Sequence, residues 1–298
     1  AMARRGPRPA VGDWVVASTA DDWATATIDE VMDRTTLLSR RAVGKAEVEQ
    51  PIAANVDTVF VLMGLDGDYN LRRLERYLVT VADSGAAAVV VLTKADISTE
   101  AVGARLDAVS VAAGAPVYII SAQTGSGLDA LRPFLEEGVT VALVGSSGAG
   151  KSTLVNALAG DEVMATGAVR SSDSHGRHTT TQRRLVSLPG GSLVVDTPGL
   201  REIQLWVDEE SLGTAFPEIE ELASGCRSRD CTHGAEPGCA VNAAVGEGRI
   251  DGDRIAGWRK LRDEVAGAER RRDTAAHREE DRRRGRMYRD AQNLKRRR

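Results

Sequence analysis

A glycine-rich segment constrains this chain more than any other feature. It is Gly145-Ser146-Ser147-Gly148-Ala149-Gly150-Lys151-Ser152-Thr153, which follows the apolar run Val141–Val144 and precedes apolar residues at helical spacing. The spacing G-x-x-x-x-G-K-S is that of the phosphate-binding loop. Backbone N–H groups of such a loop and the N-terminus of the next helix surround phosphates. The segment predicts nucleotide binding, with Lys151 on the β- and γ-phosphates and the Ser152 hydroxyl on Mg²⁺.

Residues 51–208 alternate strand-like and helix-like patterns around this loop. The strand-like runs are Val56–Leu65, Ala86–Leu92, Val117–Ile120, Val141–Val144 and Ser192–Val195. Apolar residues at helical spacing separate them at Leu71–Ala82 and Val102–Ala112. Buried strands that alternate with helices predict a doubly wound α/β sheet, with ligands at the carboxyl ends of its strands.

The two flanks differ from this pattern. Residues 11–50 carry short strand-like runs and predict a small twisted sheet or a partial barrel, since about forty residues are few for a closed five-stranded barrel. After residue 208, Glu209–Ala223 is expected to be helical, and apolar residues recur at helical spacing from Arg254. We therefore expect three domains, at residues 1–50, 51–208 and 209–298.

Two short motifs follow strands of the α/β region, and they indicate that the nucleotide carries a guanine base. Thr93-Lys94-Ala95-Asp96 resembles the guanine motif N-K-x-D, in which the carboxylate, here Asp96, accepts from guanine N1–H and N2–H₂ and the lysine stem, here Lys94, lies along the base. Thr93 stands where that motif has asparagine. Ser121-Ala122-Gln123 resembles the S-A-x loop, whose backbone N–H meets guanine O6.

Two further segments are expected at the γ-phosphate. Asp196-Thr197-Pro198-Gly199 resembles D-x-x-G, in which the aspartate holds Mg²⁺ through water and the N–H of Gly199 meets the phosphate. The polar stretch Gly176–Thr181 suits a switch that places the Thr180 hydroxyl on Mg²⁺. The predicted Mg²⁺ set is therefore Ser152, Thr180 and Asp196.

The order of these motifs indicates a circular permutation. An ordinary GTPase runs from the phosphate loop through D-x-x-G to N-K-x-D and S-A-x, whereas here residues 93–96 and 121–123 precede the phosphate loop. A site built from strand ends tolerates this change, because the termini of a domain tend to lie close together. One consequence is that the second switch, Asp196–Trp206, leads directly into the C-terminal segment.

That C-terminal segment holds all three cysteines of the chain. Cys226-x₄-Cys231-x-His233-x₅-Cys239 offers three thiolates and one imidazole within fourteen residues. A Cys₃His set fills a tetrahedral Zn²⁺ shell and leaves no open position, so one structural zinc is predicted. The metal would substitute for the core that this short segment lacks.

Charge is distributed unevenly along the 298 residues. The net charge is −4, but residues 268–298 carry +7, which leaves −11 for the rest. The basic tail fits rRNA phosphates, although a solvated charged helix fits it equally well. The N-terminus has no apolar segment of the secretory type, and the longest apolar runs are too short to span a bilayer, so we expect a cytoplasmic protein.

Taken together, these features resemble the ribosome small subunit-dependent GTPase A (RsgA/YjeQ) family. The resemblance rests on Ala53–Asp57, the permuted motif order, G-R-H-T-T-T at 176–181, D-T-P-G-L-R-E at 196–202 and C-x₄-C-x-H-x₂-E-P-G-C. It implies an N-terminal OB-fold, shortened here and without the family's opening strands, a permuted GTPase domain and a C-terminal zinc domain. It also implies a monomeric GTPase that binds GTP or GDP and acts, away from membranes, on 16S rRNA in the late maturation of the 30S subunit.

Catalysis needs a group that orients the attacking water. Ras-like enzymes place a glutamine after D-x-x-G, but this chain has Leu200 there. Our hypothesis is that His178, in the switch segment, positions the water, beside Lys151 and Thr180. The family resemblance agrees with this. Because the loop must be ordered to act, we predict slow hydrolysis alone and faster hydrolysis with the 30S subunit.

Three alternatives remain open from sequence. The protein could be a permuted GTPase of the large subunit, although the zinc segment and the N-terminal strands argue against this. It could be an RNA-binding scaffold in which the nucleotide is a structural ligand, since Leu200 cannot orient water. It could also use ATP, although Asp96 argues for guanine.

Overall fold

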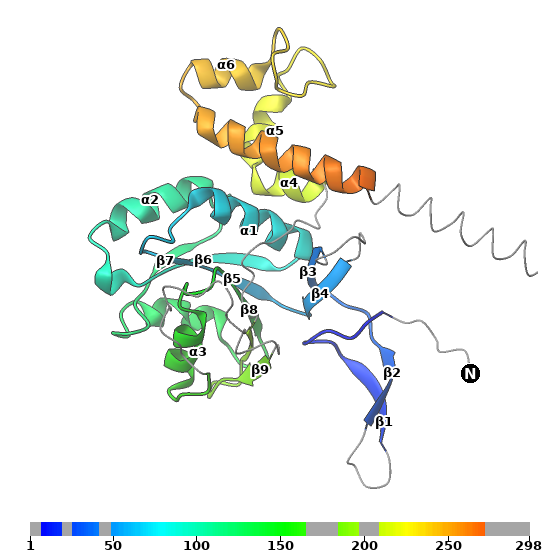
Figure 1. The fold of residues 1–298 in the computed structure, drawn as a ribbon, viewed down its shortest axis with the longest axis vertical. Helices are drawn as coiled ribbons and strands as arrows, with labels where there is room; N and C mark the ends of the chain where they lie inside the picture. Colours follow the sequence, from blue (N-terminus) through cyan, green and yellow to red (C-terminus); the bar gives the residue numbers. More distant parts are fainter. Residues whose placement is uncertain (1–6, 20–25, 42–48, 165–183, 197–208, 272–298) are drawn as a thin grey trace, which may run out of the picture.

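The computed structural model describes residues 7–19, 26–41, 49–164, 184–196 and 209–271. Its centre is a six-stranded sheet in the order β7-β6-β5-β8-β10-β9 (Figure 1). The parallel strands are β5 (Thr58–Gly64), β6 (Ala87–Thr93), β7 (Val117–Ile119), β8 (Thr140–Val144) and β10 (Leu193–Asp196). Strand β9 (Arg184–Ser187) pairs antiparallel with β10. The predicted α/β fold with a parallel sheet is confirmed.

Strand β5 shows why this sheet needs helices on both faces. All its residues are buried, and successive side chains point to opposite faces. Val61 and Met63 belong to a core cluster that includes Leu74 of the following helix. Phe60 and Leu62 belong to a second cluster, which includes Leu154 and Val155.

The helices therefore form two layers. Helices α1 (Leu71–Ser84) and α2 (Ala101–Val111) contribute to the first cluster, and α3 (Lys151–Ala159) to the second. Two 3₁₀ helices, η1 (Ala95–Ile97) and η2 (Leu128–Phe134), follow β6 and β7. The chain thus changes face between β5 and β8, the point at which a doubly wound sheet binds its ligand.

The N-terminal strands form two separate hairpins within the described residues. Strands β1 (Val15–Thr19) and β2 (Ala26–Val31) pair antiparallel, and so do β3 (Leu37–Arg41) and β4 (Glu49–Ala54). The β1–β2 hairpin is mostly exposed and projects away from the sheet (Figure 1). In contrast, Leu38 and Ile52 are fully buried in the cluster that contains α1. Residue 50, our expected domain limit, lies inside β4.

The C-terminal part is helical. It consists of α4 (Glu209–Ala215), α5 (Pro217–Ala223), α6 (Ala240–Gly246) and a long helix over residues 252–271. The continuous helix expected over 209–223 is interrupted at Phe216, because Pro217 takes the first position of α5. Proline has no N–H to extend a preceding helix, but it suits the start of a new one.

Helix α4 and the long helix over 252–271 pack on α1 (Figure 1). Phe216 and Trp258 share a core cluster with residues of α1. Gly257 permits the close approach, since a Cβ there would lie 2.6 Å from Nη1 of Arg72 and 3.0 Å from Oε2 of Glu75. No helix among the described residues is long and apolar enough to cross a bilayer.

Candidate functional site

The carboxyl ends of the parallel strands bring the predicted motifs to one edge of the sheet. Gly64 at the end of β5 is in register with Thr93, and Leu92 is in register with Ile119. On the other side of β5, Val61 pairs with Val144, the residue before the phosphate loop. The T-K-A-D segment, the S-A-Q segment and the phosphate loop therefore meet around the end of the central strand, as their positions in the sequence predict.

The phosphate loop has a backbone that only glycine adopts easily. Gly145, Gly148 and Gly150 have φ values of 155°, 87° and 90°. A Cβ at Gly145 would lie 2.6 Å from the carbonyl oxygen of Leu62, so this loop packs directly on β5. Helix α3 begins at Lys151, which places Ser152 and Thr153 in its first turn.

Lys151 is buried within this loop. Its Nζ donates to the carbonyl oxygens of Gly145 at 2.8 Å and Ser146 at 2.7 Å. The ammonium is thus held over the turn in which a phosphate would sit. The two carbonyls offer contacts that phosphate oxygens can replace, and this suits the role predicted for Lys151.

Thr93 is the last residue of β6 and lies beside the phosphate loop. Its side chain is buried, and its hydroxyl donates to the carbonyl oxygen of Ala149 at 2.7 Å. The hydroxyl therefore ties the end of β6 to the phosphate loop. Thr93 is predicted at the nucleotide, and in the structure its hydroxyl joins two loops of this edge of the sheet.

Asp96 and Ser121 contact each other across the next pair of loops. The Ser121 hydroxyl donates to Oδ1 of Asp96 at 2.6 Å, and the N–H of Ala95 donates to the Ile120 carbonyl at 3.1 Å. These bonds orient the carboxylate that we predict to read guanine. Ala122 follows Ser121 in the same loop.

Several predicted residues cannot be placed. His178, Thr180 and Gly199 lie outside the described residues, as does most of the second switch. Asp196 is the last residue of β10 and pairs with Leu143 of β8. Leu143 is followed by Val144 and then by the phosphate loop. The structure describes only the backbone of Asp196.

Sequence reasoning missed two acidic residues at this edge. Asp66 and Asp68 follow β5, and Oδ2 of Asp66 accepts from the Lys94 ammonium. Asp68 accepts from the Ser146 hydroxyl of the phosphate loop and, at 2.8 Å, from the Arg73 guanidinium. Their position shortly after a fully buried strand was a signal that could have found them.

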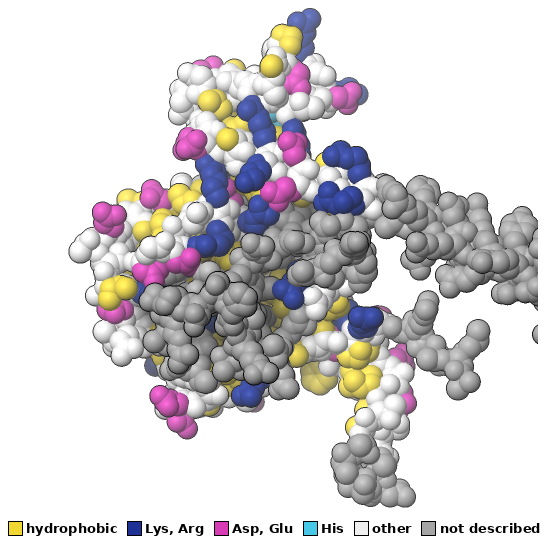
Figure 2. Space-filling model, viewed as in Figure 1, with side chains coloured by type: hydrophobic (Ala, Val, Ile, Leu, Met, Phe, Trp, Pro, Cys, Tyr) yellow, Lys and Arg dark blue, Asp and Glu magenta, His cyan; other side chains and the backbone are white. Residues whose placement is uncertain are grey.

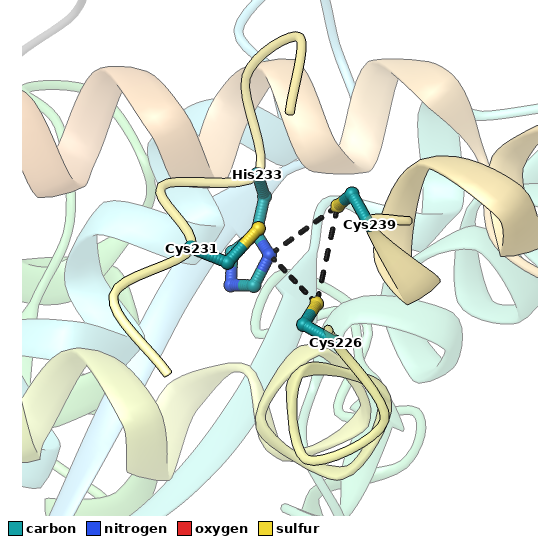
Figure 3. Close-up of side chains that lie close together, drawn as sticks. All are labelled: Cys226, Cys231, His233 and Cys239. Atoms are coloured by element: carbon teal, nitrogen blue, oxygen red, sulfur yellow. Dashed lines mark hydrogen bonds between the residues drawn. The ribbon is translucent and has the colours of Figure 1, made fainter. Parts of the chain in front are cut away.

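The second site is the cysteine–histidine cluster of the C-terminal part. Cys226 follows α5, Cys239 precedes α6, and Cys231 and His233 lie in the loop between these helices. The four side chains point toward one another (Figure 3), and their ligand atoms all lie within 4.8 Å of one another. The sequence predicted this set in full.

The spacing of these atoms fits a tetrahedral zinc ion. The Nδ1 atom of His233 lies 3.5 Å from the sulfurs of Cys226 and Cys239, which are 4.0 Å apart. Zn–S bonds of about 2.3 Å and Zn–N bonds of about 2.0 Å in a tetrahedron require separations of about 3.5–3.8 Å. The donor set is that of a structural site without an open position.

Local electrostatics differ among the four side chains. Burial by itself raises the pKa of the Cys226 thiol, but hydrogen bonds from the N–H groups of Ala240 and Val241 and from the thiols of Cys231 and Cys239 outweigh it and lower the pKa overall. The N–H of His233 lowers the pKa of Cys231, but burial and the two neighbouring thiols outweigh it and raise that pKa to about 11. Burial lowers the pKa of His233, which favours its neutral, metal-binding form. The His233 ring also packs against Trp258 at 5.4 Å, so the loop is fixed to the long C-terminal helix.

Comparisons with known proteins agree with this geometry. The family model described as RsgA GTPase matches residues 31–206. A protein of Opitutus terrae named small ribosomal subunit biogenesis GTPase RsgA is 50% identical over 93% of this chain and 78% of its own length. A protein of the same name from Methanosarcina acetivorans is 46% identical over 89% of this chain and 72% of its own length.

Solved structures show the same fold. YjeQ from Thermotoga maritima superposes with a TM-score of 0.64 at 27% identity, covering 87% of this chain and 85% of that one. YloQ, described as a circularly permuted GTPase, gives 0.62 at 27% identity, covering 89% and 83%. The permuted order of strand-end motifs, the zinc-type cluster and these matches lead to one conclusion: this chain belongs to the RsgA GTPase family.

Proposed function

We propose that this protein hydrolyses GTP to GDP and phosphate and acts in the late maturation of the 30S ribosomal subunit. The observation that carries the proposal is the phosphate loop, which meets the T-K-A-D and S-A-Q loops at one sheet edge in permuted order. Relatives that are about half identical over most of this chain are named for small-subunit biogenesis. These names do not favour action on the large subunit or a scaffold without catalysis.

The described residues suggest how a nucleotide would bind. Lys151 would exchange its two loop carbonyls for phosphate oxygens, and the N–H groups of residues 145–153 would surround the phosphates. Asp96, held by Ser121, would accept from the guanine edge. Mg²⁺ would neutralise developing charge on the phosphates and would be held by Ser152, Thr180 and Asp196.

His178 is the proposed residue for positioning the attacking water. The proposal rests on Leu200, whose side chain cannot accept a hydrogen bond, and on the place of His178 in the G-R-H-T-T-T segment. We expect His178→Ala to lower turnover by about 10²–10³-fold while GTP affinity stays nearly constant. His175→Ala, directly before this segment, is the matched control. Unchanged turnover of His178→Ala with 30S present would exclude the role.

Zinc would have a structural role. One ion held by Cys226, Cys231, His233 and Cys239 would join α5, α6 and the loop between them. It would also fix this loop against the helix over 252–271, where Arg259 contacts the His233 carbonyl.

We also propose that the chain has three domains, with limits near residues 50 and 208. We place the first of these limits at the end of β4, because residue 50 lies inside that strand.

The C-terminal part offers positive charge to 16S rRNA. Figure 2 shows Lys and Arg side chains gathered on one face across the C-terminal helices. Among residues 210–271, the exposed basic side chains are those of Arg227, Arg229, Arg249, Lys260, Arg270 and Arg271. Contacts with phosphates would make 30S binding strongly salt-dependent. We also propose that the protein acts in the cytoplasm as a monomer.

One measurement tests the proposal as a whole. GTP hydrolysis is followed with the protein alone, with purified 30S subunits and with 50S subunits as the control. We expect slow turnover alone and clear stimulation by 30S only. Stimulation by 50S instead, or the absence of multiple turnover, would refute it. Guanine recognition is tested separately by competition between GTP and ATP for binding, and a preference for ATP would refute that part of the proposal.

A further inference from the structure

The loop that follows β5 reaches into the base site. Oδ2 of Asp66 accepts from the ammonium of Lys94, and Oδ1 accepts from the N–H of Asp68 at 3.1 Å. The two carboxylate oxygens of Asp66 thus have different hydrogen-bond donors. One holds the lysine of the T-K-A-D segment, and the other closes the turn of the loop itself.

The backbone is built to bring these two side chains together. Strands β5 and β6 are in register up to Gly64 and Thr93, and the N–H of Leu65 donates to the Thr93 carbonyl at 2.9 Å. A Cβ at Gly64 would lie 2.8 Å from Oδ1 of Asp66 and 3.6 Å from Cδ of Lys94. A side chain at position 64 would therefore displace the carboxylate from its place beside the lysine.

Lys94 itself has an unusual conformation. Its φ is 63°, a left-handed value that non-glycine residues rarely adopt. Such conformations persist where surrounding contacts hold them, and they cluster at binding sites. The ion pair with Asp66 is one contact that holds this residue.

The chemistry of a lysine beside a base explains what the pair would do. The four-carbon stem can lie along the flat face of a base, while its ammonium needs a polar partner beyond the ring. Burial alone raises the pKa of Asp66, but the hydrogen bond from Lys94 and the N–H of Asp68 outweigh it and lower the pKa. Asp66 therefore stays ionised at neutral pH.

We propose that Asp66 is a positioning residue of the guanine site, which acts by fixing the Lys94 side chain for stacking on the base. The inference rests on the proposed function, because it takes residues 93–96 as the guanine motif. The same loop also contacts the phosphate loop, through Asp68 and Ser146. The β5 loop thus joins the base-binding and phosphate-binding ends of the site.

The test uses Asp66→Asn in the full-length protein. Asparagine keeps an oxygen for the Asp68 N–H and loses the negative charge toward Lys94. We expect the dissociation constants of GDP and GTP to rise by about tenfold and by the same factor, since the change acts on the base and not on the γ-phosphate. Asp263→Asn removes a charge from the exposed pair with Arg262 and is the matched control.

A double-mutant cycle separates positioning from general stability. In a Lys94→Ala background, Asp66→Asn is expected to cause no further loss of affinity, because the residue through which it acts is gone. An equal loss in both backgrounds, or wild-type affinity of Asp66→Asn, would overturn the inference alone. Wild-type affinity of Lys94→Ala would instead overturn the proposed guanine site, and the inference with it.

Discussion

Arg254 joins the C-terminal helices to the sheet domain, and its removal is expected to weaken this contact strongly. Its Nη1 donates to Oε1 of Glu75 in α1 at 2.9 Å, and its Nε donates to Oε1 of Glu218 in α5 at 2.7 Å. Its Nη2 donates to the Ala215 carbonyl at 3.2 Å, and its guanidinium lies 4.0 Å from the centre of the Phe216 ring.

The cost of Arg254→Ala follows from burial. The side chains of Arg254 and Glu75 are 7% and 1% exposed. Within the described parts of the chain, removal of the arginine leaves Glu75 with the half-exposed Arg72 as its one ion-pair partner. Breaking a buried ion pair by removing one partner costs about 3–5 kcal/mol. With an unfolding entropy of about 2.1 cal/mol/K per residue, this cost corresponds, for a chain of 298 residues, to a fall in melting temperature of roughly 5–8 °C.

Thermal and urea unfolding of matched variants measure this effect. Arg249→Ala breaks an exposed pair with Glu247 and is expected to cost less than about 1 kcal/mol. The loss of stability in Arg254→Lys is expected to lie between those of Arg254→Ala and Arg249→Ala. A lysine ammonium cannot replace a guanidinium that donates to three acceptors at once. If Arg254→Ala is no more destabilising than Arg249→Ala, the argument from burial is wrong.

Three further predictions concern the two sites. Zinc analysis is expected to find one zinc ion per chain in the wild type and none in Cys226→Ser. Loss of the ion removes roughly 10 kcal/mol of binding free energy, so hydrogen exchange in α6 is expected to become faster. Full zinc content in Cys226→Ser would contradict the site. Thr93→Val removes the buried bond to Ala149 and is expected to cost about 1–3 kcal/mol of stability, whereas Thr93→Ser keeps the hydroxyl and serves as control; equal stability of both variants would argue against the tie. Because the pKa of Asp66 is lowered from 3.8, the stabilisation by its ion pair is complete above pH 3.8 and is lost as the pH falls through the lowered pKa. The difference in unfolding free energy between wild type and Asp66→Asn should therefore shrink in acid, and a constant difference would count against the pair.

The central strands could be predicted closely from sequence. The run Ala86–Leu92 became β6 at Ala87–Thr93, and the helical pattern Leu71–Ala82 became α1 at Leu71–Ser84. Both predictions succeeded because a continuous apolar run is typical of a strand buried on two faces, and an amphipathic pattern is typical of a helix packed on it. The cysteine–histidine cluster was equally accessible, since its four ligands lie within one short segment.

Predictions at the flanks were less accurate for physical reasons. The interruption at Phe216 depends on Pro217, a local signal that the helical pattern over 209–223 concealed. The split of the N-terminal strands into two hairpins depends on which of them reaches α1. Leu38 and Ile52 do so and are buried, whereas the β1–β2 hairpin does not and stays exposed.

The sequence by itself determined the glycine-rich phosphate-loop motif, the permuted order of the motifs around it and the four members of the cysteine–histidine cluster. Each of these is local, because the chemistry is carried by residue types at a short, defined spacing. Only the tertiary structure decided what supports them. The bonds from Thr93 to Ala149 and from Asp66 to Lys94 join different strand ends, and Arg254 reaches Glu75 from 179 residues away. Contacts between distant segments depend on the register of the sheet and on the packing of helices, which no short pattern in the chain records.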